Sequence, residues 1–201
     1  MNSKIKILAL NSSPNMDSLS KKTLDFLLKE ADKNNKNLEI ENIDLNNEIF
    51  ANSSLNSSNM ANFFQKNESD KWIEKLKNSQ LLILSFPMIN FSYPAVLKNF
   101  IDSICVANKT FSYKYSKQGD AIGLLNNLKV VLISTQGAPE SWYPWGKPLE
   151  LLTGIWKFLG AKQIETLLID GTKTLPNKEL THEQIIENNK TKILQILKNI
   201  F

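Results

Sequence analysis

LLILSFPMINFSYPAVLKNFID, residues 81–102, contains three parts with different patterns. Residues 81–86 form a short, uninterrupted apolar run that ends at Pro87, which is typical of a strand buried on both faces. Residues 95–102 space their apolar side chains three and four positions apart, as an amphipathic helix does, and Pro94 suits its first turn. Residues 87–94 therefore form a loop at the carboxyl end of a buried strand, where open α/β sheets bind ligands.

This loop is more apolar than a loop exposed to water usually is. It contains Met88, Ile89 and Phe91 together with one amide side chain, Asn90. Two interpretations are open: the apolar side chains contact a ligand, or they simply pack against the edge of the sheet.

Length and composition set broad limits on the protein. A chain of 201 residues with 42% apolar and 22% charged residues is expected to form one folded domain over residues 1–201. No apolar run approaches the roughly 18 residues of a membrane span, and no secretion signal is visible, so we expect a cytoplasmic protein without membrane contacts. The net charge of +4 is spread over many lysines with interleaved acids, which predicts a solvated surface and no nucleic-acid partner.

Apolar patterns along the chain predict five strands that alternate with helices. The clean alternation of residues 38–45 predicts an edge strand, whereas the first, third and fourth runs are expected to be buried. This order predicts an α/β fold: a flavodoxin-like doubly wound five-stranded parallel sheet, order 2-1-3-4-5, with helices on both faces. The expected strands are residues 4–10, 38–45, 81–86, 129–134 and 164–170; the expected helices are about 23–33, 62–78, 94–108, 148–159 and 179–201. Residues 46–61 are expected to form a long polar connection.

The loops after the first, third and fourth strands meet at one edge of such a sheet. The first loop is rich in serine and precedes a helix, whose first N–H groups are unpaired and carry partial positive charge. Hydroxyl groups of Ser13, Ser18 and Ser20 add donors, so the loop could hold a phosphate. An ordinary helix N-cap explains the same residues equally well. Neither a G-x-G-x-x-G nor a Walker A motif is present.

A ligand for this edge would place a phosphate at the first loop and a planar body across the other two. FMN has that shape, and the backbone N–H groups of Asn90, Phe91 and Gly137 could bond to its ring. The flavin carries the hydride chemistry, so we expect no catalytic side chain and no metal site. Cys105 is expected to be a small buried helix residue, and His182 a surface residue remote from the site.

Several motifs occur in an order that matches a known family. They are Ser12-Ser13 with Ser18-x-Ser20, Pro87-Met88-x-Asn90-Phe91, Pro94-x-x-Leu97-Lys98-Asn99-Phe100-Ile101-Asp102, Phe111-x-Tyr113, Thr135-Gln136-Gly137-Ala138, Phe158-Leu159-Gly160 and Asp170-Gly171. Over nearly its full length the chain resembles the FMN-dependent NADH-azoreductases, also called FMN-dependent NADH:quinone oxidoreductases. The second motif is specific, and the others are weak alone.

This resemblance implies a homodimer with FMN at the interface and a ping-pong reaction, in which NADH or NADPH reduces the flavin and a quinone or azo compound then accepts the electrons. Tyr113 and Phe158 would lie in the substrate pocket, with Tyr113 a candidate for a contribution across the dimer. The resemblance assigns the phosphate to Ser13, Ser18, Leu19 and Ser20, and the ring to Met88, Ile89, Asn90, Phe91, Thr135, Gln136, Gly137 and Ala138.

Two positions depart from the family pattern. The family often has an aromatic residue at the position of Ile89, whose loss removes a contact worth about 0.5 to 1.5 kcal/mol. It often has Ser-Arg-Gly-Gly at residues 135–138, so Gln136 lacks a charge that could help to bind an anionic reduced flavin or substrate. The aromatic cluster of Trp142, Tyr143 and Trp145 either compensates as a wall of the site or packs at the dimer contact.

Three other functions compete with this interpretation. A non-catalytic flavodoxin-type electron carrier usually has a strongly acidic surface, whereas this chain is basic. A serine-dependent phosphodiester hydrolase would use Ser12 or Ser13, but it needs a base, and the chain has one histidine. A phospho-accepting receiver domain is disfavoured because no carboxylate follows the first strand. The sequence does not identify the physiological acceptor or the choice between NADH and NADPH.

Overall fold

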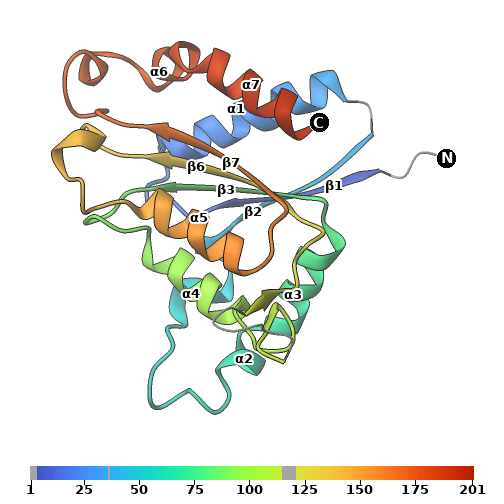
Figure 1. The fold of residues 1–201 in the computed structure, drawn as a ribbon. Helices are drawn as coiled ribbons and strands as arrows, with labels where there is room; N and C mark the ends of the chain where they lie inside the picture. The colour runs from blue at the N-terminus through green and yellow to red at the C-terminus, as the bar shows by residue number, and fades with distance from the viewer. Residues whose placement is uncertain (1–3, 36, 115–120) are drawn as a thin grey trace.

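The computed structural model describes residues 4–35, 37–114 and 121–201. Its main sheet has five parallel strands in the order β2-β1-β3-β6-β7, which confirms the predicted flavodoxin-like topology (Figure 1). These strands are β1 (Ile5–Asn11), β2 (Leu38–Asp44), β3 (Leu81–Pro87), β6 (Lys129–Thr135) and β7 (Gln163–Ile169). As predicted, β3 is buried along almost its whole length, and β2 is a partly exposed edge strand.

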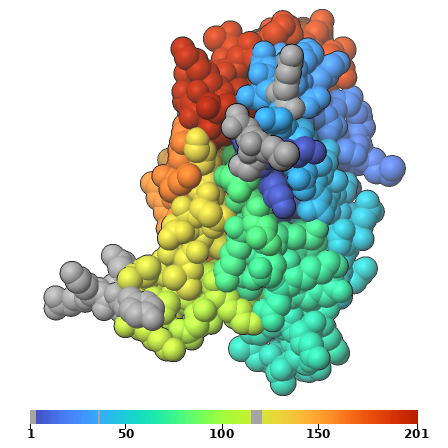
Figure 2. Space-filling view, turned by 90° about the vertical axis from the view of Figure 1, so that its right-hand side faces the viewer, coloured from blue at the N-terminus to red at the C-terminus, as the bar shows by residue number. Residues whose placement is uncertain are grey.

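Helices cover both faces of this sheet (Figure 1). One face carries α1 (Leu19–Asn34), α6 (His182–Asn188) and α7 (Lys190–Ile200), and the other carries α3 (Ser69–Asn78), α4 (Ala95–Ile104) and α5 (Pro148–Phe158). Figure 2 shows the molecule from the edge at which β1 begins, with α1 and α7 above and α3 below. Helices α4 and α5 begin at the opposite edge, where the strands end, and run back from it (Figure 1).

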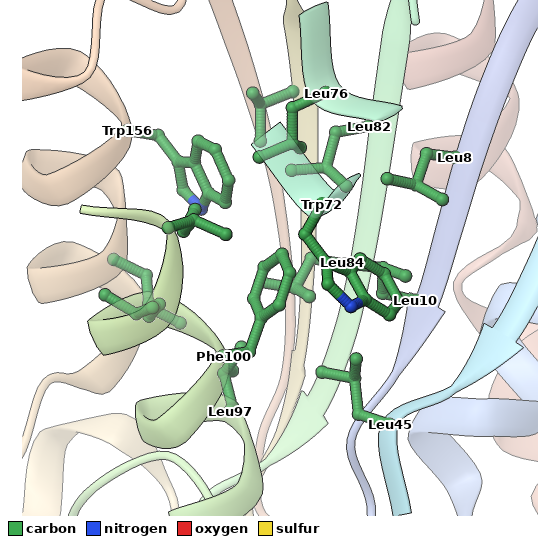
Figure 3. Close-up of a cluster of buried hydrophobic side chains, with 14 of the residues drawn as sticks. Leu8, Leu10, Leu45, Trp72, Leu76, Leu82, Leu84, Leu97, Phe100 and Trp156 are labelled. Atoms are coloured by element: carbon green, nitrogen blue, oxygen red, sulfur yellow. The ribbon is translucent and has the colours of Figure 1, made fainter. Parts of the chain in front are cut away.

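Alternate side chains of the strands enter two hydrophobic cores. Leu8 and Leu10 of β1 face the core under α3, α4 and α5, whereas Ile7 and Ala9 face the core under α1 and α7. Figure 3 shows the first core, in which Trp72 and Phe100 lie over the leucines of β1 and β3, with their ring centroids 5.6 Å apart. Burial of these faces on both sides explains why the central strands have unbroken apolar sequences.

Both long predicted helices are interrupted. The segment predicted as a helix over 62–78 divides into α2 (Phe63–Lys66) and α3, and Glu68 between them has a φ of 50°. The final helix divides at Asn189 into α6 and α7. Cys105 caps the C-terminus of α4 rather than lying inside a longer helix, and burial raises the pKa of its thiol to about 11.

The segment predicted as a polar connection over 46–61 is anchored at its beginning. Residues 45–47 and 49–52 form two short 3₁₀ helices, and Phe50 is completely buried. Its ring lies 5.1 Å from Trp72 and 5.3 Å from Phe100, and its carbonyl oxygen accepts a hydrogen bond from Asn99. The prediction of a long polar connection is therefore wrong for this first part.

A small hairpin follows α4. Strand β4 (Phe111–Ser112) pairs with β5 (Ile122–Gly123), and the backbone of Gly123 lies against Gly160 after α5. Residues 115–120, which connect the two strands in the sequence, lie outside the described residues. No described helix is long and apolar enough to cross a membrane.

Candidate functional site

The carboxyl ends of the strands surround a cavity of about 340 Å³. It lies where the predicted topology places a ligand, between the loops that follow β1, β3 and β6. Its volume falls within the range of small-molecule sites. The predicted cofactor residues that line it are Ser13, Ser18, Leu19, Met88, Ile89, Thr135, Gln136 and Gly137; those that do not are Ser20, Asn90, Phe91 and Ala138.

Ser18 is the N-cap of α1, and it also lines the cavity. Its hydroxyl oxygen accepts a 3.4 Å hydrogen bond from the N–H of Lys21 and lies 2.9 Å from the hydroxyl of Ser20. Within the described chain, the backbone N–H groups of Leu19 and Ser20 have no acceptor. The two interpretations of this loop are therefore compatible: the serines cap the helix, and the first turn keeps donors for an anion.

The loop after β3 turns sharply at Asn90 and Phe91. Their φ values are 46° and 67°, in the left-handed region that a bulky residue rarely adopts. Ile89 and Ser92 exchange hydrogen bonds of 2.8 and 3.0 Å across the turn, so its geometry is that of a two-residue hairpin. Neither turn N–H has an acceptor among the residues described. Backbone strain of this kind is concentrated at functional sites.

The ring of Phe91 packs on an aromatic cluster instead of lining the cavity. Its centroid lies 4.4 Å from that of Trp145 and 5.2 Å from that of Tyr143. Trp145 and the nearby Trp142 are 69% and 59% exposed. Tyr143 and Trp145 of the predicted cluster therefore do lie together beside the loop, and the exposed tryptophan rings fit either a wall of the site or a dimer contact.

The loop after β6 is fixed by hydrogen bonds to its neighbours. The carbonyl oxygen of Thr135 accepts from the N–H of Met88 at 2.7 Å, and Gln136 donates from its backbone N–H to Ile169. The N–H of Gly137 has no acceptor in the described structure. A Cβ atom at this glycine would lie 3.0 Å from Cγ of Lys173, so the close approach of Lys173 favours glycine here.

Lysine and histidine side chains of the segment after β7 complete the cavity, and the sequence pattern did not indicate them. They are Lys173, Lys178 and His182. The prediction that His182 is remote is wrong: Nδ1 of His182 lies 3.7 Å from a carboxylate oxygen of Asp17, which also lines the cavity. Lys22, 2.8 Å from Asp17, holds the pKa of that carboxyl below its ordinary value through a hydrogen bond.

The arrangement does not form a serine nucleophile. The hydroxyl of Ser12 is completely buried and donates to the carbonyl oxygen of Ser85, while that of Ser13 accepts from the N–H of Asn15. In the part of the chain that the structure describes, neither serine is hydrogen-bonded to His182. The same part contains no group of three metal-ligating side chains.

Tyr113 and Phe158 lie together but not at the cavity. Phe111 lies between them, with its ring centroid 5.4 Å from Tyr113 and 4.9 Å from Phe158. Both flanking rings are exposed, by 65% and 40%. They come from the β4 strand region and the end of α5, which runs away from the edge where the strands end (Figure 1).

Comparison with known proteins agrees with this topology. A family model described as a flavodoxin-like fold matches residues 5–197. The chain is 48% identical over 170 residues, 85% of both chains, to the FMN-dependent NADH:quinone oxidoreductase of Mycoplasmopsis synoviae. It is 44% identical to the enzyme of that name from Mycoplasmopsis pulmonis, over 90% of this chain and 92% of the other. An FMN-dependent NADH-azoreductase of Bacillus anthracis, solved with FMN, shares the fold with a TM-score of 0.79 and 19% identity, covering 98% and 99% of the two chains.

Proposed function

Because this chain belongs to the family of FMN-dependent NADH:quinone oxidoreductases, which has a flavodoxin-like fold, we propose that it binds FMN in the cavity described above and transfers electrons from NADH to quinones and azo compounds. The observation that carries this proposal is the set of unpaired backbone donors at the two ends of one cavity. One end has the capped first turn of α1, and the other has the loops after β3 and β6.

The residues present fit FMN at both ends of the cavity. The N–H groups of Leu19 and Ser20 and the hydroxyl of Ser18 suit a phosphate group. The N–H of Gly137 suits an acceptor atom on the polar edge of the ring, while Met88 and Ile89 offer apolar contact. When bound, FMN would accept the hydride and later pass the electrons on. The chain therefore needs no acid or base side chain for the electron transfer.

Four assigned residues would act without lining the cavity. Asn90 and Phe91 would contribute the backbone N–H groups of their strained turn. Ser20 would orient the hydroxyl of Ser18, and the carbonyl oxygen of Ala138 holds the amide of Gln136. The protein scaffold therefore positions and surrounds the cofactor rather than taking part in bond making.

A second copy of the chain would complete the substrate pocket. Tyr113 and Phe158 are exposed and do not line the cavity of their own chain, which supports a role for them at the cofactor ring of a partner. We expect a homodimer with an FMN site at each interface edge. Donor and acceptor would use the same exposed face of the ring in turn, as a ping-pong reaction requires.

Titration of the purified protein with FMN, followed by flavin fluorescence and absorption, tests this function. We expect saturable binding, bleaching of the absorption when NADH is added without oxygen, and recovery when a quinone or azo dye follows. Initial rates at several NADH and quinone concentrations should give parallel double-reciprocal lines. A protein that does not bind FMN contradicts the proposal, and intersecting lines contradict the ping-pong order alone.

A further inference from the structure

Lys173 is held directly over the loop that follows β6. Its backbone N–H donates to the carbonyl oxygen of Gly137 at 2.8 Å, and both the N–H and the hydroxyl of Thr172 bond to the carbonyl oxygen of Gln136 at 3.1 Å. The side-chain stem of Lys173 crosses the open face of Gly137. Three hydrogen bonds and one close contact therefore fix where this lysine leaves the backbone.

Gln136 itself offers no charge to the cavity. Gln136 is buried, with 7% of the residue exposed, and its amide nitrogen donates to the carbonyl oxygen of Ala138 at 3.0 Å. The amide is thus occupied within its own loop. Any positive charge beside Gly137 has to come from a neighbouring segment.

The ammonium group of Lys173 is available for that role. Lys173 lines the cavity, and no carboxylate of the described residues lies within 4 Å of its Nζ atom. Asp17, the carboxylate that lines the same cavity, is paired with Lys22. The charge of Lys173 is therefore not neutralised by an ion pair.

A positive charge at this place has a chemical consequence for a flavin. Bound FMN would accept a hydride, which is two electrons and one proton, from NADH, and NAD⁺ would be released. The reduced cofactor would carry one negative charge at the polar edge of its ring until a second proton reached it. A cation near that edge stabilises the reduced form more than the neutral oxidised form.

We propose that Lys173 stabilises reduced FMN and thereby raises the reduction potential of the bound cofactor. It supplies the charge that Gln136 lacks, from the segment after β7 instead of the loop after β6. This inference rests on the proposed function, since it requires FMN to occupy the cavity with its ring beside Gly137.

Lys173→Met tests the inference because it removes the ammonium group and keeps the unbranched stem over Gly137. Dissociation constants of oxidised and reduced FMN would be measured without oxygen, together with the midpoint potential. We expect reduced FMN to bind about tenfold more weakly and oxidised FMN to bind nearly as before, which lowers the two-electron potential by about 30 mV. Lys173→Arg keeps the positive charge and should give the potential of the unmodified protein. Lys198→Met removes the charge of an exposed lysine on α7 and should leave the potential unchanged.

Two results would overturn the inference while leaving the proposed function intact. One is an unchanged potential in Lys173→Met with normal FMN binding. The other is an equal loss of affinity for both oxidation states, which would assign Lys173 to the phosphate or to the structure of the loop. Failure of the unmodified protein to bind FMN would overturn both proposals.

Discussion

Ser18 combines two tasks in one side chain. It caps α1 through its hydroxyl oxygen, and it lines the cavity next to the unpaired N–H groups of Leu19 and Ser20. Asp is as good an N-cap as Ser, so a carboxylate at this position preserves the helix. It also places a negative charge where the cofactor's phosphate would lie.

We therefore expect Ser18→Asp to separate these tasks. FMN affinity should fall about a hundredfold because a carboxylate replaces a donor beside a phosphate, whereas the midpoint of urea unfolding should stay within the error of the unmodified protein. Thr181→Asp is the matched control, since the Thr181 side chain also accepts from the third backbone N–H of its helix, α6, and does not line the cavity. Riboflavin, which has no phosphate, should bind the Ser18 variant almost normally; an equal loss for riboflavin would contradict a phosphate site here.

Among the residues that line the cavity, the sequence predicted the ones that lie immediately after a strand. Ser13, Met88 and Gly137 follow β1, β3 and β6, and the strand pattern alone located them. Lys173 and His182 could not be found in this way because they are ordinary surface residue types in a turn and at a helix start. The signal that could have found them is topological: β7 lies beside β6, so its carboxyl end reaches the same edge.

The elements follow from the sequence except where a helix is interrupted. Apolar spacing continues through Glu68 and through Asn189, although each of these residues lies between two separate helices. The spacing of apolar residues indicates which face of a helix is buried. Two short helices that differ in direction can keep the same apolar face against the sheet, so the spacing does not reveal the break between them. Likewise, Phe50 is one aromatic residue in a polar segment, and only the contacts with Trp72 and Phe100 show that it belongs to the core.

Gly160 has a role beyond ending α5. Its φ is 99°, as a helix C-terminus requires, and its backbone also meets that of Gly123 in β5. A Cβ atom on Gly123 would lie 2.2 Å from the nitrogen of Gly160, too close for either backbone to remain in place. The two glycines therefore join the small hairpin to the end of α5.

Gly123→Ala should accordingly destabilise the protein by at least about 2 kcal/mol, because backbone atoms and not a flexible side chain block the new methyl group. Urea unfolding followed by circular dichroism measures this change. Gly154→Ala is the control: its Cβ meets nothing within 4 Å inside α5, so it should be neutral or stabilise by up to about 1 kcal/mol. Equal stability of the two variants would show that the hairpin is not tightly joined to α5.

At the scale of the whole molecule, the residues assigned to the cofactor and those assigned to the substrate lie in two different places. The cofactor residues gather at the carboxyl ends of the strands, whereas Tyr113 and Phe158 lie together elsewhere on the surface. The sequence predicted both groups through family resemblance, but it did not show their separation, because distance between segments depends on how α4 and α5 run over the sheet. The proposed homodimer would reconcile this separation with a single substrate pocket.

Mixing two defective variants tests whether the pocket is shared. Ser18→Asp impairs the cofactor site of its own chain, and Phe158→Ala should impair the site of its partner. In a mixed dimer one site then contains both defects and the other contains neither. Half of the dimers in an equal mixture are mixed, and each has one of its two sites complete, so about one quarter of the unmodified quinone reductase activity should return after subunit exchange.

The same mixture gives a different result if each chain builds its own pocket. Every site would then contain either the Ser18 or the Phe158 defect, and mixing would restore nothing above the average of the separate variants. Sedimentation of the mixture verifies that dimers are present and that exchange has occurred. A return of activity therefore requires Phe158 to act across the interface, and dimers without such a return would place the acceptor pocket within one chain.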